Sequence, residues 1–186
     1  MFQLPFPVQD ANANSGRMDG DGPMGKLPEW NLDDLYTGED APELQRDLEW
    51  LETACASFAA DYEDKLADLD ATGLLDCVLR NEKINQVAGR IMSYAGLRYY
   101  QLTTDAGRAK FMSDAQEKIT NYTTPLVFFT LELNRLDDDH MNKLLATNAD
   151  LARYKPVFDR IRAMKKYQLS DELEKFMHDL GVVGDA

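Results

Sequence analysis

Apolar residues recur at intervals of three and four positions from about residue 42 onward. This spacing places them on one face of an α-helix, whereas a half-buried strand would alternate apolar and polar residues. No alternating stretch of any length occurs, so the chain is predicted to be all-α. The first apolar stripe consists of Leu44, Leu48, Leu51, Cys55, Phe58, Tyr62 and Leu66.

A second stripe follows a turn expected at residues 70–73. It consists of Leu74, Val78, Ile84, Val87, Ile91, Tyr94 and Leu97. Two helices joined by a short turn are usually antiparallel neighbours, so the fold should begin with a long helix hairpin. A third helix is expected from Asp105 to Leu133. Pro125 lies within it and should kink or briefly break it, because proline removes a backbone donor.

Three shorter helical segments are expected after that. One starts at Asp137, one covers residues 150–166, and the last opens at Ser170 and stops at Gly181. We therefore expect an antiparallel helical bundle of about five to six helices over residues 42–182.

The first 41 residues have a different character. Residues 1–26 are rich in Gly, Asn, Asp and Pro and are predicted to form a disordered leader. Residues 27–41 carry Trp and Leu side chains and are predicted to form an extended strap packed on an apolar surface. Asp10, Asn12 and Asn14 have the spacing of a calcium loop. Ser15 and Asp21 stand where such a loop needs Gly and Glu, so no calcium site is predicted.

The net charge of the chain limits the classes of partner that it could bind. The 186 residues carry 20 basic and 33 acidic side chains, a formal net charge of −13. The excess lies in the first 70 residues, since residues 71–186 balance. Such a chain is a poor ligand for a nucleic-acid backbone or an anionic membrane. The acids of the first helix, among them Glu43, Asp47 and Glu52, are expected to form a solvated face.

The sequence shows neither a signal peptide nor an apolar run long enough to span a membrane, so a cytoplasmic location is expected. The two cysteines, Cys55 and Cys77, form no CxxC pair. Their positions in the expected hairpin differ by about 15 Å along the helix axis, too far for a disulfide. Both are predicted to be free, buried thiols.

No catalytic or metal-binding residue is predicted, and the substrate-binding residues stay unknown. The only histidines, His140 and His178, belong to no HExxH motif, and both are expected on the surface near helix ends. Arg98, Tyr99 and Tyr100 lie near the end of the second helix. They could face a ligand, but such residues more often close the end of a helix pair.

Three segments, in order, resemble the N-terminal region of oligoendopeptidase F, of the thimet-oligopeptidase-like zinc metallopeptidases. Residues 27–36, LPEWNLDDLY, resemble the opening LPxWDLSDLY, with Asn31 in place of Asp. Residues 128–133, FFTLEL, are similar to SFFxLEL. Residues 154–174 resemble a stretch that contains IRRxKPHxLSExEE, with Lys166 where Pro is common. Together the matches cover roughly residues 27–180.

The resemblance implies an all-helical region that forms one wall of a deep peptide channel. It implies a cytosolic zinc metalloendopeptidase that hydrolyses short oligopeptides, with HExxH in a catalytic domain elsewhere in the longer chain. Zinc is therefore expected in the full-length parent only. The fragment should be inactive alone, its main partner being the rest of its own chain, and a homodimer could form through exposed apolar stripes.

The alternative is a self-contained acidic helical module for protein interaction or dimerisation. Its acidic first helix and apolar strap would meet a basic or apolar partner. The two hypotheses differ in what the gene encodes beyond Ala186.

Overall fold

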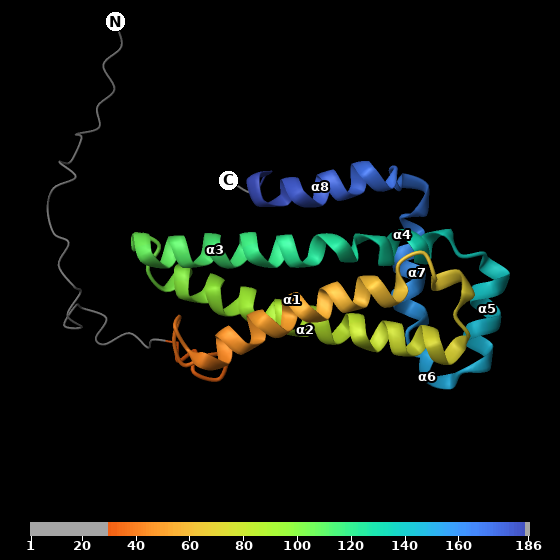
Figure 1. Ribbon diagram of the computed structural model, residues 1–186, viewed down its shortest axis with the longest axis horizontal. Coiled ribbons are helices and arrows are strands. Elements are labelled where there is room, and N and C mark those ends of the chain that lie inside the picture. The colour runs from red at the N-terminus through yellow and green to blue at the C-terminus, as the bar shows by residue number, and fades with distance from the viewer. Residues whose placement is uncertain (1–29, 185–186) are drawn as a thin grey trace, which may run out of the picture. The chain divides into compact units, whose positions relative to one another are not determined.

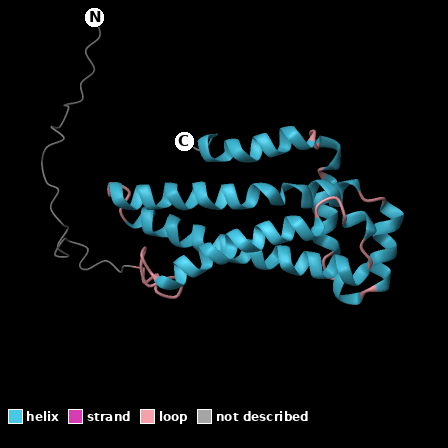
Figure 2. Cartoon of the chain, viewed as in Figure 1, coloured by secondary structure: helices cyan, strands magenta, loops and turns pink. Residues whose placement is uncertain are grey.

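The computed structural model describes residues 30–184, and over them the chain contains helices, turns and loops but no strand (Figure 2). The all-α prediction is confirmed. The chain divides into two compact units, residues 1–31 and 32–186. The first contributes only Trp30 and Asn31 to the described residues. The leader of residues 1–26 and its calcium-like spacing lie outside them. All the described helices belong to the second unit.

Three long helices dominate this unit: α1 (Pro42–Tyr62), α2 (Ala71–Gln101) and α3 (Ala106–Thr123). Helix α2 contacts both α1 and α3, and successive helices run in opposite directions (Figure 1). The apolar stripes face the core as predicted. In α1 the buried residues are Leu44, Leu48, Leu51, Cys55 and Phe58.

Aspartates begin the second and third helices. Asp70 accepts a hydrogen bond from the backbone nitrogen of Gly73 at 2.7 Å, and Asp105 accepts from Gly107 and Arg108 at 2.8 and 3.1 Å. Such N-caps satisfy donors that the helix leaves free in its first turn. Because Asp70 caps it, α2 starts at Ala71, and Gly73 lies inside the helix instead of in the expected turn.

The second half contains more and shorter helices than predicted. These are α4 (Val127–Arg135), α5 (Asp138–Thr147), α6 (Ala149–Ala152), α7 (Lys155–Ala163) and α8 (Asp171–Gly184). Pro125 breaks the expected third helix as predicted, at the 3₁₀ turn η2 (Thr124–Leu126). Pro156, in the first turn of α7, separates that helix from α6. Gly181 does not end α8, which continues to Gly184.

The core contains an aromatic cluster that joins α1 to α4. Phe58 is fully buried. Its ring centroid lies 5.8 Å from those of both Phe128 and Phe129 and 5.0 Å from that of Tyr62. These are favourable separations for tilted and edge-to-face aromatic contacts. The Phe-Phe pair of the 128–133 segment thus fixes α4 against the first helix.

The connection between α1 and α2 is held by a carboxylate from α4. Glu132 Oε1 accepts the backbone N–H of Asp64 at 2.7 Å, and Oε2 accepts that of Leu66 at 3.2 Å. Asp64 adopts a left-handed backbone with φ of 63°, a conformation that Asp tolerates better than most residues. Burial raises the pKa of Glu132, while the two backbone hydrogen bonds oppose that shift.

The strap expected over residues 27–41 is not continuously extended in its described part. The backbone nitrogens of Leu35 and Tyr36 both donate to the carbonyl of Leu32, which makes a turn. Tyr36 is buried, and its hydroxyl donates to Asp47 at 2.6 Å. The Arg90 guanidinium lies 4.4 Å from the Tyr36 ring centroid. This turn is therefore anchored to both α1 and α2.

Replacing Phe58 by Ala should lower the free energy of unfolding by about 3–5 kcal/mol, because it removes the centre of the aromatic cluster and leaves a cavity. Urea unfolding followed by circular dichroism measures this. The exposed aromatic Trp50, on the same helix, provides the control W50A, which should cost far less. Equal losses in the two variants would contradict the assigned role of Phe58.

Replacing Glu132 by Ala should cost about 1–3 kcal/mol, because two backbone donors of the α1–α2 connection lose their acceptor. Hydrogen exchange should localise the effect to residues 63–68. The matched control is Glu117→Ala, which removes an exposed glutamate from α3. Unchanged protection at residues 63–68 in E132A would argue against this contact.

Candidate functional site

Within the described residues, a groove lies between the N-terminal half of α1 and the middle of α3. Its volume is about 340 Å³, and α2 lies beneath it. The floor is apolar and consists of Leu44, Leu48, Ile91, Phe111 and Ala115. Such a surface can accept an apolar side chain or a short apolar segment.

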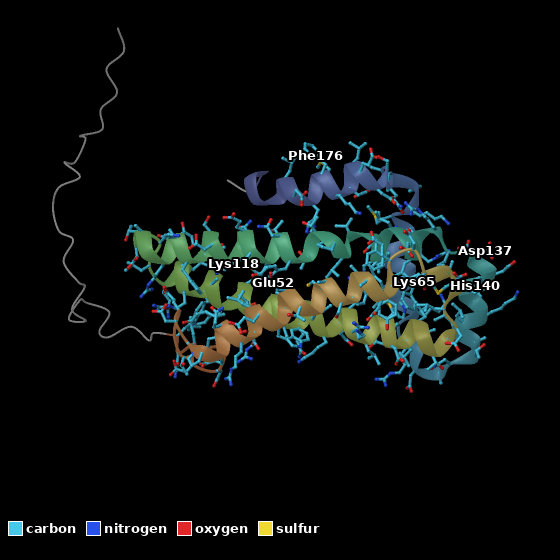
Figure 3. The ribbon with its side chains drawn as sticks, in the orientation of Figure 1. Glu52, Lys65, Lys118, Asp137, His140 and Phe176 are labelled. Atoms are coloured by element: carbon cyan, nitrogen blue, oxygen red, sulfur yellow. The ribbon has the colours of Figure 1, made fainter. Side chains whose placement is uncertain are left out.

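The rim of the groove is charged. Glu39 and Asp40 border it where the 32–41 segment enters α1, and Asp114 and Lys118 border it on α3. Lys110 neutralises Asp114 through an ion pair at 2.6 Å. Figure 3 labels Lys118 on α3 and Glu52 on α1, the two helices that flank the groove. Glu39 is likewise neutralised by an ion pair with Arg98 at 3.2 Å, and no ion pair of Asp40 is seen among the described residues.

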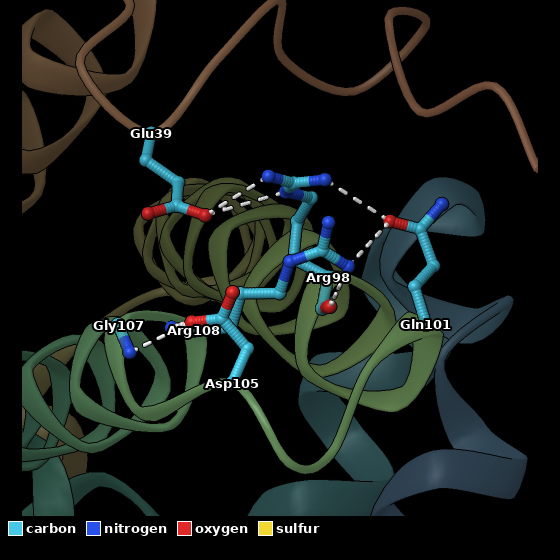
Figure 4. A network of polar contacts seen from close by, with 6 residues as sticks. All are labelled: Glu39, Arg98, Gln101, Asp105, Gly107 and Arg108. Atoms are coloured by element: carbon cyan, nitrogen blue, oxygen red, sulfur yellow. Dashed lines mark hydrogen bonds and ion pairs between the residues drawn. The ribbon is translucent and has the colours of Figure 1, made fainter. Parts of the chain in front are cut away.

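The end of α2 forms a polar network with the start of α3 and the segment before α1 (Figure 4). Arg98 Nε and Nη2 lie 3.3 and 3.2 Å from Glu39 Oε1, and Nη1 donates to Gln101 at 3.1 Å. Arg108 donates to the Arg98 carbonyl at 3.2 Å. Arg98 thus closes the helix end and holds Glu39 at the rim of the groove.

The neighbouring tyrosines, Tyr99 and Tyr100, lie against each other with ring centroids 5.4 Å apart. Tyr100 is largely exposed. Neither lines the groove. The structure therefore assigns Arg98 a structural part in the network and brings none of the three residues into the concave site.

The histidines are less exposed than predicted. His178 is partly buried, with Nε2 3.3 Å from Thr123 Oγ1. His140 is also partly buried, and its Nε2 makes no hydrogen bond among the described residues. Both were expected on the surface, but each is partly buried, and His178 faces α3. Asp137, labelled with His140 in Figure 3, caps α5 by accepting the N–H groups of Asp139 and His140.

The described residues contain no group of three or more His, Cys, Asp or Glu side chains placed to hold a metal ion. A tetrahedral zinc site needs three or four such ligands converging on one point. The residues from 30 to 184 therefore do not fit a zinc centre.

Both cysteines are buried and free, as predicted. Burial raises the pKa of the Cys55 thiol to about 11 and that of the Cys77 thiol to about 12. The thiolate is the nucleophilic form, so neither residue is suited to covalent catalysis at neutral pH.

The sequence did not reveal this groove. Its walls come from residues 39–48, Ile91 and residues 111–118, and only the packing of three helices brings these segments together. The signal that could have found the site is the acidic pair Glu39 and Asp40, which Ala41 separates from the proline that starts α1.

Comparison with known proteins relates part of this fold to a class of peptidases. Residues 132–186, from the end of α4 to the last residue, match the model of the N-terminal region of the family described as Oligopeptidase F. The resemblance to the N-terminal region of oligoendopeptidase F is confirmed over these residues. The curated proteins and the solved structures yielded no significant match.

The match covers the third of the resembling segments and the last two residues of the second. The first, residues 27–36, lies outside it.

None of the helices between residues 30 and 184 has the length and apolar content needed to cross a membrane.

Cys55 and Cys77 should react slowly with iodoacetamide at pH 8 in the native chain and rapidly after unfolding in urea. Unfolding returns each pKa to about 8.5, which raises the thiolate fraction by more than tenfold. In the native state the rate should climb as the pH approaches 11. Mass spectrometry of quenched samples measures this. Equal native and unfolded rates would contradict the burial of the thiols.

Proposed function

We propose that this chain is the N-terminal helical part of a zinc metalloendopeptidase that hydrolyses short oligopeptides. The observation that carries the proposal is the match of residues 132–186 to the Oligopeptidase F family. The ordered resemblance of residues 27–36 and 128–133 extends the same assignment toward the N-terminus. In such a parent the catalytic residues belong to another domain.

In that parent the helical domain forms one wall of the peptide channel. A wall must stay rigid so that short unfolded peptides enter and folded proteins do not. The packing supports this role, because α2 is the long central helix and contacts both α1 and α3. The aromatic contacts of Phe58 with Phe128 and Phe129 fix the second half of the domain to that layer.

Zinc belongs to the parent and not to this region. The described residues do not converge as metal ligands, and the sequence holds only two histidines in separate helices. The metal would be held by the HExxH motif of the catalytic domain, where it would activate water for peptide hydrolysis. The contribution of this region is to position and select the peptide.

The proposal makes the rest of the same polypeptide the principal partner, and short peptides the substrates. A cytoplasmic location is proposed with it. The exposed acids Glu49 and Glu52 of the first helix support a solvated outer surface, whereas Glu43 and Asp47 are partly buried.

The reading frame downstream of Ala186 should encode an HExxH motif. DNA sequencing of the locus tests this directly. A stop codon immediately after Ala186, with no such motif in the gene, would overturn the proposal and favour a self-contained interaction module.

The parent enzyme should cleave a quenched fluorescent oligopeptide, and a zinc chelator should abolish cleavage. The 186-residue chain alone should bind no stoichiometric zinc and show no cleavage above a buffer blank. The chain with Cys55 and Cys77 changed to Ser controls for adventitious metal on thiols. Chelator-sensitive cleavage by the purified chain would contradict its assignment as a non-catalytic wall.

A further inference from the structure

Helix α8 is amphipathic, yet it presents its polar side to the rest of the fold. It lies along α3 and also contacts α4 and η2 (Figure 1). The usual arrangement for a surface helix is the opposite, with the apolar stripe against the core and the polar face in solvent. The reversal indicates that the apolar stripe serves another contact.

Polar and charged residues make the inward contacts. His178 meets Thr123, Asp179 accepts from the Thr124 hydroxyl at 2.7 Å, and Lys175 pairs with Glu63 at 3.5 Å. Asp171 forms an ion pair with Arg135. These contacts fix which side of α8 faces the bundle, so the rotation of the helix is defined by four separate partners.

The outward side carries four large apolar residues at spacings of three and four. Leu173 is 50% exposed, Phe176 57%, Met177 56% and Leu180 39%. In Figure 3, Phe176 lies on the side of α8 away from α3. Together they form an exposed apolar stripe along one side of α8, and contiguous exposed apolar surface on a monomer often marks an interaction site. We call these four residues the α8 stripe.

The charges beside the α8 stripe indicate what covers it. Glu172 and Asp179 border one edge, since they fall seven residues apart on the helix, and Glu174 borders the other. Asp179 and Glu174 accept hydrogen bonds only from neutral donors, the Thr124 hydroxyl and the Leu169 N–H. None of these three carboxylates forms an ion pair within residues 30–184, so their negative charge is uncompensated.

A second copy of this chain is a poor occupant. Antiparallel pairing of two α8 helices would bring each acidic edge against the same acidic edge of the other copy. A partner with positive charge beside its apolar residues would instead neutralise both edges, which gives a charge pattern complementary to the stripe. The cations in ion pairs with α8 residues or on α8 itself, Arg135 and Lys175, pair with Asp171 and Glu63 and not with these three carboxylates.

We propose that the α8 stripe is a docking surface for an apolar protein segment bordered by Lys or Arg residues. The apolar residues of the segment cover Leu173, Phe176, Met177 and Leu180, and its cations meet Glu172, Glu174 and Asp179. The proposal does not rest on the peptidase assignment and can fail or succeed independently of it.

A synthetic helical peptide of about 18 residues, long enough to form a helix, serves as the probe. It carries Leu at helical spacings of three and four with Lys at the other positions, and fluorescence anisotropy measures its binding to the 186-residue chain. Two peptides provide controls: the same pattern with Glu for Lys, and a scrambled Leu/Lys peptide of equal charge. The patterned Leu/Lys peptide should bind at least tenfold more tightly than either.

Phe176→Glu should weaken that binding at least tenfold, and Met177→Glu provides a second test of the same stripe. The matched control is Leu79→Glu, which places the same charge at an exposed leucine of α2 and should leave affinity within twofold. Glu172→Lys should weaken binding severalfold and flatten its salt dependence, whereas Asp76→Lys, on α2, should not. Circular dichroism confirms that each variant is folded.

Three outcomes would overturn the proposal. The first is unchanged peptide affinity in both F176E and M177E, which would place the peptide elsewhere on the acidic chain. The second is a wild-type dimer in sedimentation that F176E abolishes, which would make a second copy the occupant. The third is binding to phosphatidylcholine–phosphatidylglycerol vesicles that F176E abolishes, which would make a lipid surface the occupant.

Discussion

The contact of Phe58 with Phe128 and Phe129 is the interaction on which the rest of the fold depends. It joins the long N-terminal helices to the short helices that follow Pro125. Glu132, one turn beyond Phe128, then reaches the α1–α2 connection and satisfies two of its backbone donors. Both contacts come from the short α4, so one element determines the position of the second half of the chain relative to the first.

Local patterns predicted much of this fold. The apolar stripes of α1 and α2 identified their buried residues, and Pro125 marked the break before α4. The patterns failed where a single residue determined where a helix begins or ends. Gly73 was taken for a turn although Asp70 caps the helix there, and Pro156 divided the segment expected to run from residue 150 to 166. A helix cap involves only about three residues, so it does not change the spacing of apolar residues along the chain.

The groove was beyond prediction for a different reason. Its walls come from residues far apart in the chain. The periodicity of apolar residues predicts which side chains are buried, but it does not predict which helices pack so as to leave a groove between them. The histidines show the same limit. His178 was expected in solvent because it lies near a helix end, but α8 faces the bundle with its polar side and buries that ring in part. Only the packed structure shows that α8 turns its polar side toward the bundle, the reverse of the usual orientation of an amphipathic helix.

The polar attachment of α8 has a consequence for how the molecule opens. Ion pairs and hydrogen bonds near solvent contribute little net free energy, since water competes for the same groups. Separating α8 from α3 would therefore expose few apolar side chains and cost much less than unfolding the Phe58 cluster. We therefore expect α8 to detach as a unit more readily than the long helices separate. A partner bound to the outer side of α8 would hold the helix in place. The attachment of α8 would therefore report whether such a partner is bound.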